Sequence, residues 1–474
     1  MHKDSLKTMK VIDQDLIQDS REAYLIGIGG SGMSGLARIL KHLGLAVSGS
    51  DTKETRVTQA LRQSGIPVFI GQTSVDFGNA DLIIYSSAIH KDHIELKGAR
   101  ALGRKVHHRA EVLASLLNHA GTSIGVLGTH GKTTTTAMVS HVLSQLGVNP
   151  TCFVGSDMLN YDTNIVAGSK DYMVCEVDES DSSHEFYAPH YSIITNLEPE
   201  HLDHYSSWEN LTQSFRRFLE QVHDPGLVSY WGDDPALNSL VRESGRPFVN
   251  FGFSEDCVYA ARNIRLHAFG SEFDLYESGL FSMAMKLSVP GRHNIANALA
   301  TLSILLHLGF DLESVREALA TFKGTRRRME LKCQTPEFLV LDDYAHHPTE
   351  VKAVLRALRE AGKYIRVIFQ PHRFSRTKNL CVDFAHAFDD AHEVVLTDIY
   401  GAGEANPGGV SVELIYDEVI KTGHKHASVV HKEQIIPYLM KHPLRDGVMI
   451  FMGAGDIGEI ANEYVRNIRA GAAA

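Results

Sequence analysis

Short apolar runs alternate along this chain with segments in which apolar residues recur at helical spacing. Apolar runs of four or five residues are typical of buried strands, whereas apolar residues at i, i+3, i+4 and i+7 predict helices. The predicted strands are 24–28, 45–47, 82–85, 124–127, 172–175, 191–194, 337–341, 365–369, 393–397 and 448–452. The predicted helices are 33–43, 109–118, 139–146, 298–308 and 349–361. This alternation predicts an α/β protein with parallel sheets.

The length of 474 residues is too great for one hydrophobic core, and ordinary domain sizes predict about three domains. The pattern is interrupted at Gly121-Thr122 and again near Lys323-Gly324-Thr325. We therefore expect three consecutive α/β domains. They comprise residues 1–121 (Rossmann-like), 122–325 (a central P-loop ATPase domain) and 326–474 (Rossmann-like).

A glycine-rich turn lies between the predicted strand 124–127 and the helix that follows it. Such a turn presents backbone N–H groups and a helix N-terminus to an anion. In a loop that ends in Gly-Lys-Thr, Lys132 reaches the terminal phosphates and the Thr133 hydroxyl binds Mg²⁺. Val126 stands where the usual P-loop has its first glycine. The predicted ATP-binding loop is Gly128, Thr129, His130, Gly131, Lys132, Thr133 and Thr134.

A second glycine motif, Gly-x-Gly-x-x-Gly, follows the first predicted strand at Gly27, Gly29 and Gly32, and Asp51 ends the second strand. In a βαβ unit this motif holds a diphosphate on a helix N-terminus, with the acid near a ribose. Taken alone it favours NAD. The same spacing recurs at Gly453–Gly458, where we interpret the glycines as close packing between strand and helix.

Two predicted strands of the central domain end in acidic segments, Glu176–Asp181 and Glu198–Asp203. The carboxyl ends of parallel strands meet at one edge of a sheet, where α/β proteins place their sites. Mg²⁺ prefers hard oxygen ligands together with phosphates. We therefore predict a metal site of Thr133, Glu176 and His201, although without the P-loop the acid and the histidine would be ordinary surface residues.

The formal net charge of −11 argues against a nucleic-acid partner, because no excess of basic residues is present to neutralise phosphates. The five cysteines are scattered and include no Cys-x-x-Cys pair, so we expect neither a zinc ribbon nor a disulfide framework. The first 20 residues lack the apolar core of a signal peptide, and no apolar run approaches the roughly 18 residues of a membrane span. These features predict a cytoplasmic protein.

The order and spacing of all these motifs resemble the Mur ligase family over nearly the whole chain. The resemblance rests on Ile28–Gly35, Gly128–Thr134, Glu176–Asp181, His201–Asp203, Gly291–Asn297, Asp342–Pro348 and Gln370–Thr377. Within the family, the pattern is most similar to the branch that joins L-alanine to UDP-N-acetylmuramate. The resemblance implies an ATP- and Mg²⁺-dependent ligase of peptidoglycan precursor synthesis, acting as a monomer or homodimer.

The family's chemistry implies roles for particular residues. ATP phosphorylates the lactyl carboxylate of UDP-N-acetylmuramate, and the amine of L-alanine then attacks the acyl phosphate. The implied UDP-substrate contacts are Gly29, Gly30, Ser31, Gly32, Met33 and Asp51. The implied further ATP contacts are His293, Asn294, Arg328 and Asp343. The implied amino-acid pocket is Tyr344, His346, Arg373 and Arg376, where a planar guanidinium matches the carboxylate of free alanine. The implied catalytic set is Lys132, Glu176, His201 and Arg376.

One departure from the family pattern concerns a second metal. Several relatives use a carbamylated lysine after the His-x-Asp motif, but no lysine occurs between His201 and Trp231, as in the alanine-adding branch.

Two other enzymes stay open as alternatives. A recycling ligase of the same family would attach a tripeptide to UDP-N-acetylmuramate. An NAD-dependent oxidoreductase would use Gly27–Gly32 but would leave the P-loop and Glu176 without a role.

Overall fold

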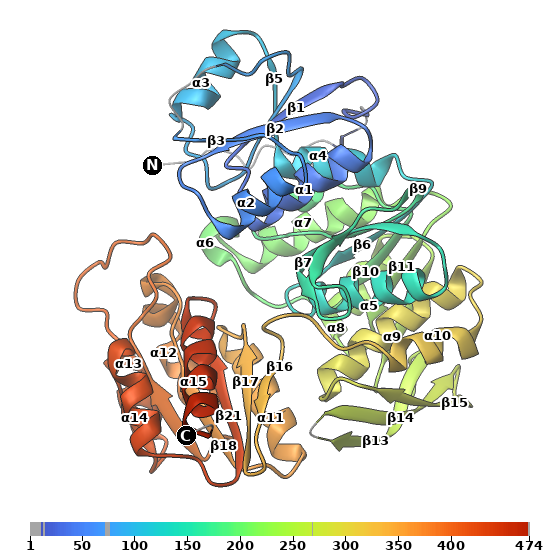
Figure 1. The fold of residues 1–474 in the computed structure, drawn as a ribbon. Coiled ribbons are helices and arrows are strands. Elements are labelled where there is room, and N and C mark those ends of the chain that lie inside the picture. The colour runs from blue at the N-terminus through green and yellow to red at the C-terminus, as the bar shows by residue number, and fades with distance from the viewer. Residues whose placement is uncertain (1–10, 13–14, 72–75, 268, 473–474) are drawn as a thin grey trace. The chain divides into compact units, whose positions relative to one another are not determined.

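The computed structural model describes residues 11–12, 15–71, 76–267 and 269–472. It confirms the predicted α/β class: helices alternate with strands that form three sheets in the described part of the chain (Figure 1). The chain divides into two compact units. The first contains the residues up to Arg262 with Leu275–Met283 and Ala296–Leu319, and the second contains Asn263–Asp274, Ala284–Ile295 and Ala320–Ala474.

The N-terminal sheet is parallel and has the strand order β3-β2-β1-β4-β5. Its strands are β1 (Glu22–Ile26), β2 (Ala46–Asp51), β3 (Val68–Ile70), β4 (Leu82–Tyr85) and β5 (Lys105–His108). Its helices are α1 (Ser31–His42), α2 (Arg56–Gln63), α3 (Ile94–Ala101) and α4 (Arg109–Asn118). The strand order reverses between β1 and β4, so the Gly27–Gly32 turn emerges at the switch point where such sheets bind ligands.

The central sheet has the strand order β15-β14-β13-β12-β11-β10-β6-β9-β7-β8. Its first strands are β6 (Thr122–Leu127), β7 (Pro150–Met158), β8 (Thr163–Val166), β9 (Ser169–Glu176) and β10 (Tyr191–Ile194). The others are β11 (Leu227–Trp231), β12 (Phe248–Gly252), β13 (Tyr259–His267), β14 (Gly270–Glu277) and β15 (Leu280–Leu287). The α-helices are α5 (Lys132–Gln145), α6 (Leu202–Tyr205), α7 (Trp208–Gln221), α8 (Pro235–Glu243), α9 (Arg292–His307) and α10 (Leu312–Ala320). Because β6 is parallel to both β9 and β10, the three segments that follow these strands start at the same edge.

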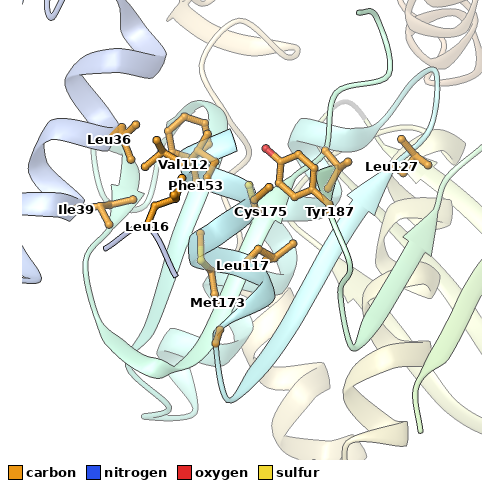
Figure 2. Close-up of a cluster of buried hydrophobic side chains, with 14 of the residues drawn as sticks. Leu16, Leu36, Ile39, Val112, Leu117, Leu127, Phe153, Met173, Cys175 and Tyr187 are labelled. Atoms are coloured by element: carbon orange, nitrogen blue, oxygen red, sulfur yellow. The ribbon is translucent and has the colours of Figure 1, made fainter. Parts of the chain in front are cut away.

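The N-terminal and central sheets share one buried hydrophobic cluster. Leu36 and Ile39 of α1 and Val112 of α4 lie beside Phe153 of β7 and Met173 of β9 (Figure 2). The approach is close at Gly35, where an added Cβ would lie 2.1 Å from Ile165 Cδ1. This packing joins α1 and α4 to β7 and β9 within the first compact unit.

The C-terminal sheet has the order β16-β17-β21-β18-β19-β20, with β16 antiparallel at one edge. Its strands are β16 (Glu330–Gln334), β17 (Phe338–Asp343), β18 (Ile365–Phe369), β19 (Glu393–Leu396), β20 (Ala427–Val429) and β21 (Gly447–Met452). Its α-helices are α11 (Pro348–Glu360), α12 (Phe374–Ala387), α13 (Glu413–Lys421), α14 (Ile435–Lys441) and α15 (Ile457–Ala472). Two buried clusters of apolar residues contain side chains from these strands.

The glycines at the end of β21 are in close contact with neighbouring groups, as the packing interpretation predicted. An added Cβ would lie 2.6 Å from the Gln370 carbonyl oxygen at Gly453 and 2.3 Å from Gln370 Oε1 at Gly455. At Gly458 it would lie 2.7 Å from Asp342 Oδ2. The Gly-x-Gly-x-x-Gly spacing therefore serves close packing here.

Two predicted helices begin earlier than the apolar pattern indicated. The helix predicted over 139–146 is α5, which begins at Lys132. The apolar pattern predicted a helix over 298–308, but α9 begins at Arg292, so the Gly291–Asn297 motif forms its first turns. The apolar pattern does not extend into these first turns because they contain polar residues. The side chains of these residues bond to nearby groups. Asn294 donates to the Pro290 carbonyl oxygen at 2.7 Å, and Asn297 Oδ1 accepts from the Thr135 hydroxyl at 3.1 Å.

The predicted domain boundaries, at residues 121 and 325, stay predictions. In the described part of the chain, no helix combines the length and the apolar character needed to cross a membrane.

Candidate functional site

The predicted P-loop connects β6 to α5, and its glycines are required by its geometry. Gly128 has a φ of 136°, and an added Cβ would lie 2.2 Å from Thr195 Oγ1. Gly131 precedes α5 with a φ of 83°, in the left-handed region that favours glycine. The loop therefore turns tightly onto the N-terminus of a 14-residue helix, whose first backbone N–H groups are available to an anion.

Two residues that the sequence analysis missed hold this loop in place. Asn196 Oδ1 accepts from the His130 N–H at 2.8 Å, and its amide donates to the His130 carbonyl at 3.0 Å. Thr195 Oγ1 donates to the same carbonyl at 2.5 Å. Both residues follow β10 directly. Their position after a predicted strand of the central domain was the available indication, but the hydrogen bonds depend on the adjacency of β10 and β6.

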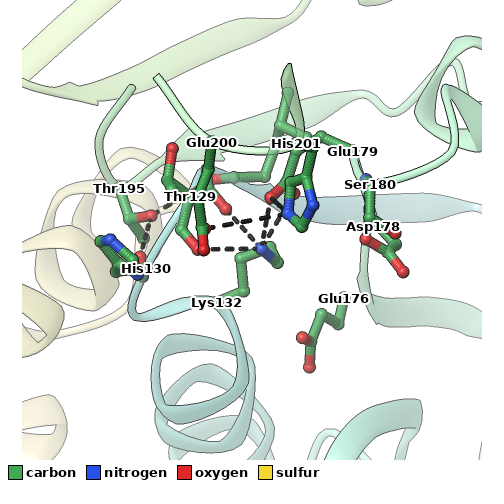
Figure 3. Close-up of polar contacts among 12 residues, drawn as sticks. Thr129, His130, Lys132, Glu176, Asp178, Glu179, Ser180, Thr195, Glu200 and His201 are labelled. Carbon is green, nitrogen blue, oxygen red and sulfur yellow. Dashed lines mark hydrogen bonds and ion pairs between the residues drawn. The ribbon is translucent and has the colours of Figure 1, made fainter. Parts of the chain in front are cut away.

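Lys132 is almost enclosed, with its side chain 13% exposed. Its Nζ donates to the carbonyl oxygens of Gly128 at 2.6 Å and Thr129 at 3.2 Å, and it lies 3.0 and 2.8 Å from the two carboxylate oxygens of Glu179 (Figure 3). Burial opposes the charged form, but the neighbouring carboxylates, chiefly that of Glu179, outweigh it and raise the pKa of Lys132. The amine is therefore a fixed positive charge under the loop.

The sequence analysis did not select Glu179, which the structure places between two predicted site residues. It is 1% exposed and interacts with both Lys132 and His201, whose Nε2 lies 3.5 Å from Glu179 Oε1. Burial would raise the pKa of Glu179, but the charge of Lys132 and the bond from His201 lower it to about 2. In the sequence, Glu179 was one of several acids in 176–181, and only the fold distinguishes it from the exposed Asp178.

His201 follows β10 and has a φ of 55°. Its Nε2 also lies 3.8 Å from Glu200 Oε2. Burial would lower the pKa of His201, but the bond to Glu179 and the charge of Glu200 raise it. The structure thus brings His201 together with Lys132 through Glu179. A protonated imidazole binds no metal, so a ligand role for His201 requires loss of its proton.

The other two predicted metal ligands lie together. The Thr133 hydroxyl is 3.0 and 2.9 Å from the two carboxylate oxygens of Glu176, which also accepts the Gly155 N–H at 2.9 Å. Within the described residues, no cluster of three His, Cys, Asp or Glu side chains could hold a metal ion. The oxygen pair nevertheless suits Mg²⁺, which is commonly held by one or two protein oxygens with substrate phosphates as further ligands.

The predicted UDP-substrate loop is ordered by Asp51, whose Oδ2 accepts the Gly29 N–H at 2.8 Å. Gly30 precedes α1 and Ser31 begins it, although the Ser31 side chain lies outside the described part of the structure. Met33 is buried beneath the loop.

Arg109, which the sequence analysis did not select, lies against the same loop. An added Cβ on Gly32 would be 2.8 Å from Arg109 Nη1. A guanidinium beside the predicted diphosphate loop would suit an anionic ligand.

In the C-terminal sheet, Asp343 is buried at the end of β17 and accepts the N–H groups of Met329 and Ala345, each at 2.7 Å. Burial raises the pKa of Asp343 to about 6 against the opposing charge of Arg328. Arg328 lies 5.3 Å from the centre of the Tyr344 ring. Burial, together with the charge of the same arginine, lowers the pKa of His293 to about 4.

The predicted amino-acid pocket is partly assembled. His346 contacts Tyr344 and His372, with ring centres 5.3 and 5.5 Å apart, and Arg376 Nη1 lies 3.3 Å from His372 Nδ1. Burial lowers the pKa of His346 to about 3 and that of His372 to about 4, so both imidazoles are neutral.

The Arg373 side chain has a different neighbour: it lies 3.7 Å from the carboxylate of Glu404 and is 48% exposed. The sequence analysis did not select His372, because its contact with His346 joins two loops that are distant in the sequence.

Family models, curated proteins and solved structures all resemble this chain over most of its length. Three family models match in succession: "Mur ligase family, catalytic domain" over residues 22–120, "Mur ligase middle domain" over 126–305 and "Mur ligase, glutamate ligase domain" over 327–455. The chain is 40% identical over 453 residues to the UDP-N-acetylmuramate–L-alanine ligase of Pelotomaculum thermopropionicum, which covers 95% of this chain and 98% of that protein. It is also 40% identical over 460 residues to the same-named protein of Symbiobacterium thermophilum, with 95% of each chain covered.

Solved structures agree with this comparison. The crystal structure of the UDP-N-acetylmuramate–alanine ligase of Thermotoga maritima matches with a TM-score of 0.80 and 32% identity, over 95% of this chain and 100% of that one. A murein peptide ligase of Psychrobacter arcticus matches with a TM-score of 0.68 and 22% identity, over 94% and 98% of the two chains. The second likeness shows a shared fold alone.

Proposed function

The chain belongs to the Mur ligase family, and from that membership we propose that it joins L-alanine to the lactyl carboxylate of UDP-N-acetylmuramate, with ATP converted to ADP and phosphate. The observation that carries this proposal is the match along 98% of a relative that bears this activity in its name. The alternatives are not favoured. The murein peptide ligase of Psychrobacter arcticus is 22% identical, and an NAD-dependent oxidoreductase would leave the middle-domain match without a role.

The reaction proceeds in two balanced steps. A lactyl carboxylate oxygen forms a bond to the γ-phosphorus of ATP while the bond from that phosphorus to ADP breaks, giving an acyl phosphate. The alanine nitrogen then bonds to the acyl carbon, the carbon–oxygen bond to phosphate breaks, and the amine loses a proton. Lys132 neutralises charge on the transferred phosphoryl group, and the N-terminus of α5 holds the other phosphates. Thr133 and Glu176 would hold Mg²⁺, which neutralises phosphate charge when bound.

The amino acid is held by the C-terminal domain in this proposal. Arg376 binds the alanine carboxylate, and the rings of Tyr344 and His346 limit the space beside it. A neutral His346 adds no charge to the pocket, which suits a small apolar side chain. The cytoplasmic location, and the choice between monomer and homodimer, stay predictions.

The proposed function is tested by phosphate release. Purified protein with ATP, Mg²⁺ and UDP-N-acetylmuramate is expected to release phosphate when L-alanine is added, and the product should gain the mass of one alanyl residue. Glycine and L-serine serve as comparisons for the pocket, and the tripeptide tests the recycling alternative. Release with the tripeptide but not with L-alanine would replace the proposal.

Calorimetry with UDP and NAD then tests the first domain, where we expect saturable uridine-nucleotide binding and no NAD binding.

Replacing Glu176 by glutamine should raise the Mg²⁺ concentration needed for half-maximal activity by about tenfold. The variant keeps the size of the side chain but removes the charge that suits a divalent cation. A Mg²⁺ titration of ligation at saturating ATP measures this. Glu243→Gln, which removes an exposed carboxylate paired with Arg216, is the control and should leave the titration unchanged. An unaltered titration in Glu176→Gln would remove Glu176 from the metal site.

A further inference from the structure

We infer that Glu179 is an internal counter-ion that competes with phosphate for Lys132 and so lowers the affinity of the loop for nucleotide. The inference rests on the proposed function, since it concerns the same ATP site. It assigns Glu179 a positioning role: the carboxylate holds Lys132 in place under the loop and speeds the release of nucleotide after the reaction.

An ammonium group has three N–H donors and no acceptor. Among the described residues, the partners of the Lys132 nitrogen are the carbonyl oxygens of Gly128 and Thr129 and the Glu179 carboxylate (Figure 3). A phosphate oxygen that binds Lys132 must therefore displace one of these partners or share a donor with it.

The partners of Lys132 differ in how readily phosphate can displace them. The two carbonyls belong to the backbone of the loop, which is fixed by the φ of Gly128 and by the Asn196 bonds to His130. Glu179 reaches Lys132 with a side chain that has rotatable bonds. Its negative charge also repels phosphate, whereas a carbonyl carries only a partial charge. Glu179 is thus the partner that phosphate replaces.

The displaced Glu179 carboxylate has a second partner close by. Glu179 is 1% exposed, so its charge is poorly screened and would be costly without a partner. His201 Nε2 already lies 3.5 Å from Glu179 Oε1, which gives the carboxylate a second site of attraction. The carboxylate therefore stays close to the loop after displacement, and it returns to Lys132 as the phosphate leaves.

The experiment measures nucleotide affinity in Glu179→Gln. Calorimetry with ADP and with ATP, each in EDTA, gives the dissociation constants free of metal effects. We expect Glu179→Gln to bind both nucleotides about tenfold more tightly than the parent, because the competing charge is removed. Its KM for ATP should fall together with kcat, whereas simple damage to the fold would lower kcat without tightening binding. Equal or weaker binding by the folded variant overturns the inference.

Glu185→Gln is the matched control. Glu185 lies in the same segment, its side chain is 2% exposed, and it pairs with Arg217 at 2.6 Å. It makes no contact with the P-loop among the described residues, so its loss should leave both dissociation constants unchanged. If Glu185→Gln tightens binding as much as Glu179→Gln does, the effect is a general consequence of lost buried charge and the inference fails.

Two further variants serve different purposes. One is a substitute in case Glu179→Gln does not fold, and the other tests whether Glu179 acts through Lys132. Glu179→Met fills the same volume with an apolar chain and replaces Glu179→Gln if that variant does not fold. In a Lys132→Met background, the further change Glu179→Gln should tighten binding much less than it does in the parent, because the competition for the ammonium group is gone and only the direct repulsion of phosphate remains. A parent protein that binds no nucleotide would instead count against the proposed function. A parent that binds nucleotide and a Glu179→Gln variant that binds it equally would count against this inference alone.

Discussion

Replacing Lys132 by alanine should lower kcat for ligation by about 10²–10³-fold, the usual effect of removing one donor that stabilises transition-state charge. Lys132 is the cation that the structure places under the P-loop, within 3.0 Å of Glu179 and among loop carbonyls. The transferred phosphoryl group carries its charge at this loop in the proposed mechanism. The measurement is steady-state phosphate release with all three substrates saturating.

This variant has a predictable side effect. Without Lys132, the buried Glu179 carboxylate loses its main partner, and breaking such a pair typically costs about 3–5 kcal/mol of folding free energy. The double variant Lys132→Ala, Glu179→Gln removes both charges, so it should recover most of the stability and none of the activity. Thermal unfolding and phosphate release, measured side by side, separate the two effects.

Two further results complete the Lys132 test. Lys286→Ala, which removes an exposed lysine of β15, should retain parental activity and stability. If the folded double variant ligates alanine at the parental rate, Lys132 has no part in phosphate transfer.

Replacing Arg376 by alanine should lower kcat/KM for L-alanine by about 10–100-fold, because hydrogen bonds to a charged partner contribute about 1.5–3 kcal/mol. Arg376→Lys keeps the charge but loses the planar fork, so it should also impair the use of alanine. Arg373→Ala should change kcat/KM less than about threefold, since that guanidinium is half-exposed and lies beside Glu404. The measurement varies alanine at saturating ATP and UDP-N-acetylmuramate.

The control for Arg376 is Arg356→Lys, a change at a 65% exposed arginine of α11 that pairs with Glu360. It should have parental kinetics. Calorimetric binding of ATP should also be unchanged in Arg376→Ala. If Arg376→Ala and Arg376→Lys both use alanine as the parent does, the amino-acid carboxylate binds elsewhere.

The local pattern of the chain determined most of its secondary structure. Strands 82–85, 191–194 and 365–369 and the helix 109–118 have the predicted bounds, because a buried parallel strand needs a continuous apolar run and a helix needs an apolar stripe. The tight turn between β6 and α5 was also predictable, since its glycines and Lys132-Thr133 lie in one short stretch that follows a strand; its binding of ATP stays a prediction. The start of α9 was not, because Asn294 and Asn297 occupy positions that apolar residues would mark in an ordinary helix.

The partners of the site residues were decided only by the tertiary structure. Glu179 was one acid among several in the sequence, and its distinction is that the turn after β9 buries it against Lys132 and His201. Arg109 contacts the Gly32 loop because α4 follows a strand two places from β1. Arg373 and Arg376 are three residues apart, yet Arg376 lies beside His372 while Arg373 lies beside Glu404. Residue types and spacing along the chain determined which chemical groups are present. Which of these groups lie together depends on which strands are neighbours in each sheet. That strand order arises from long-range packing.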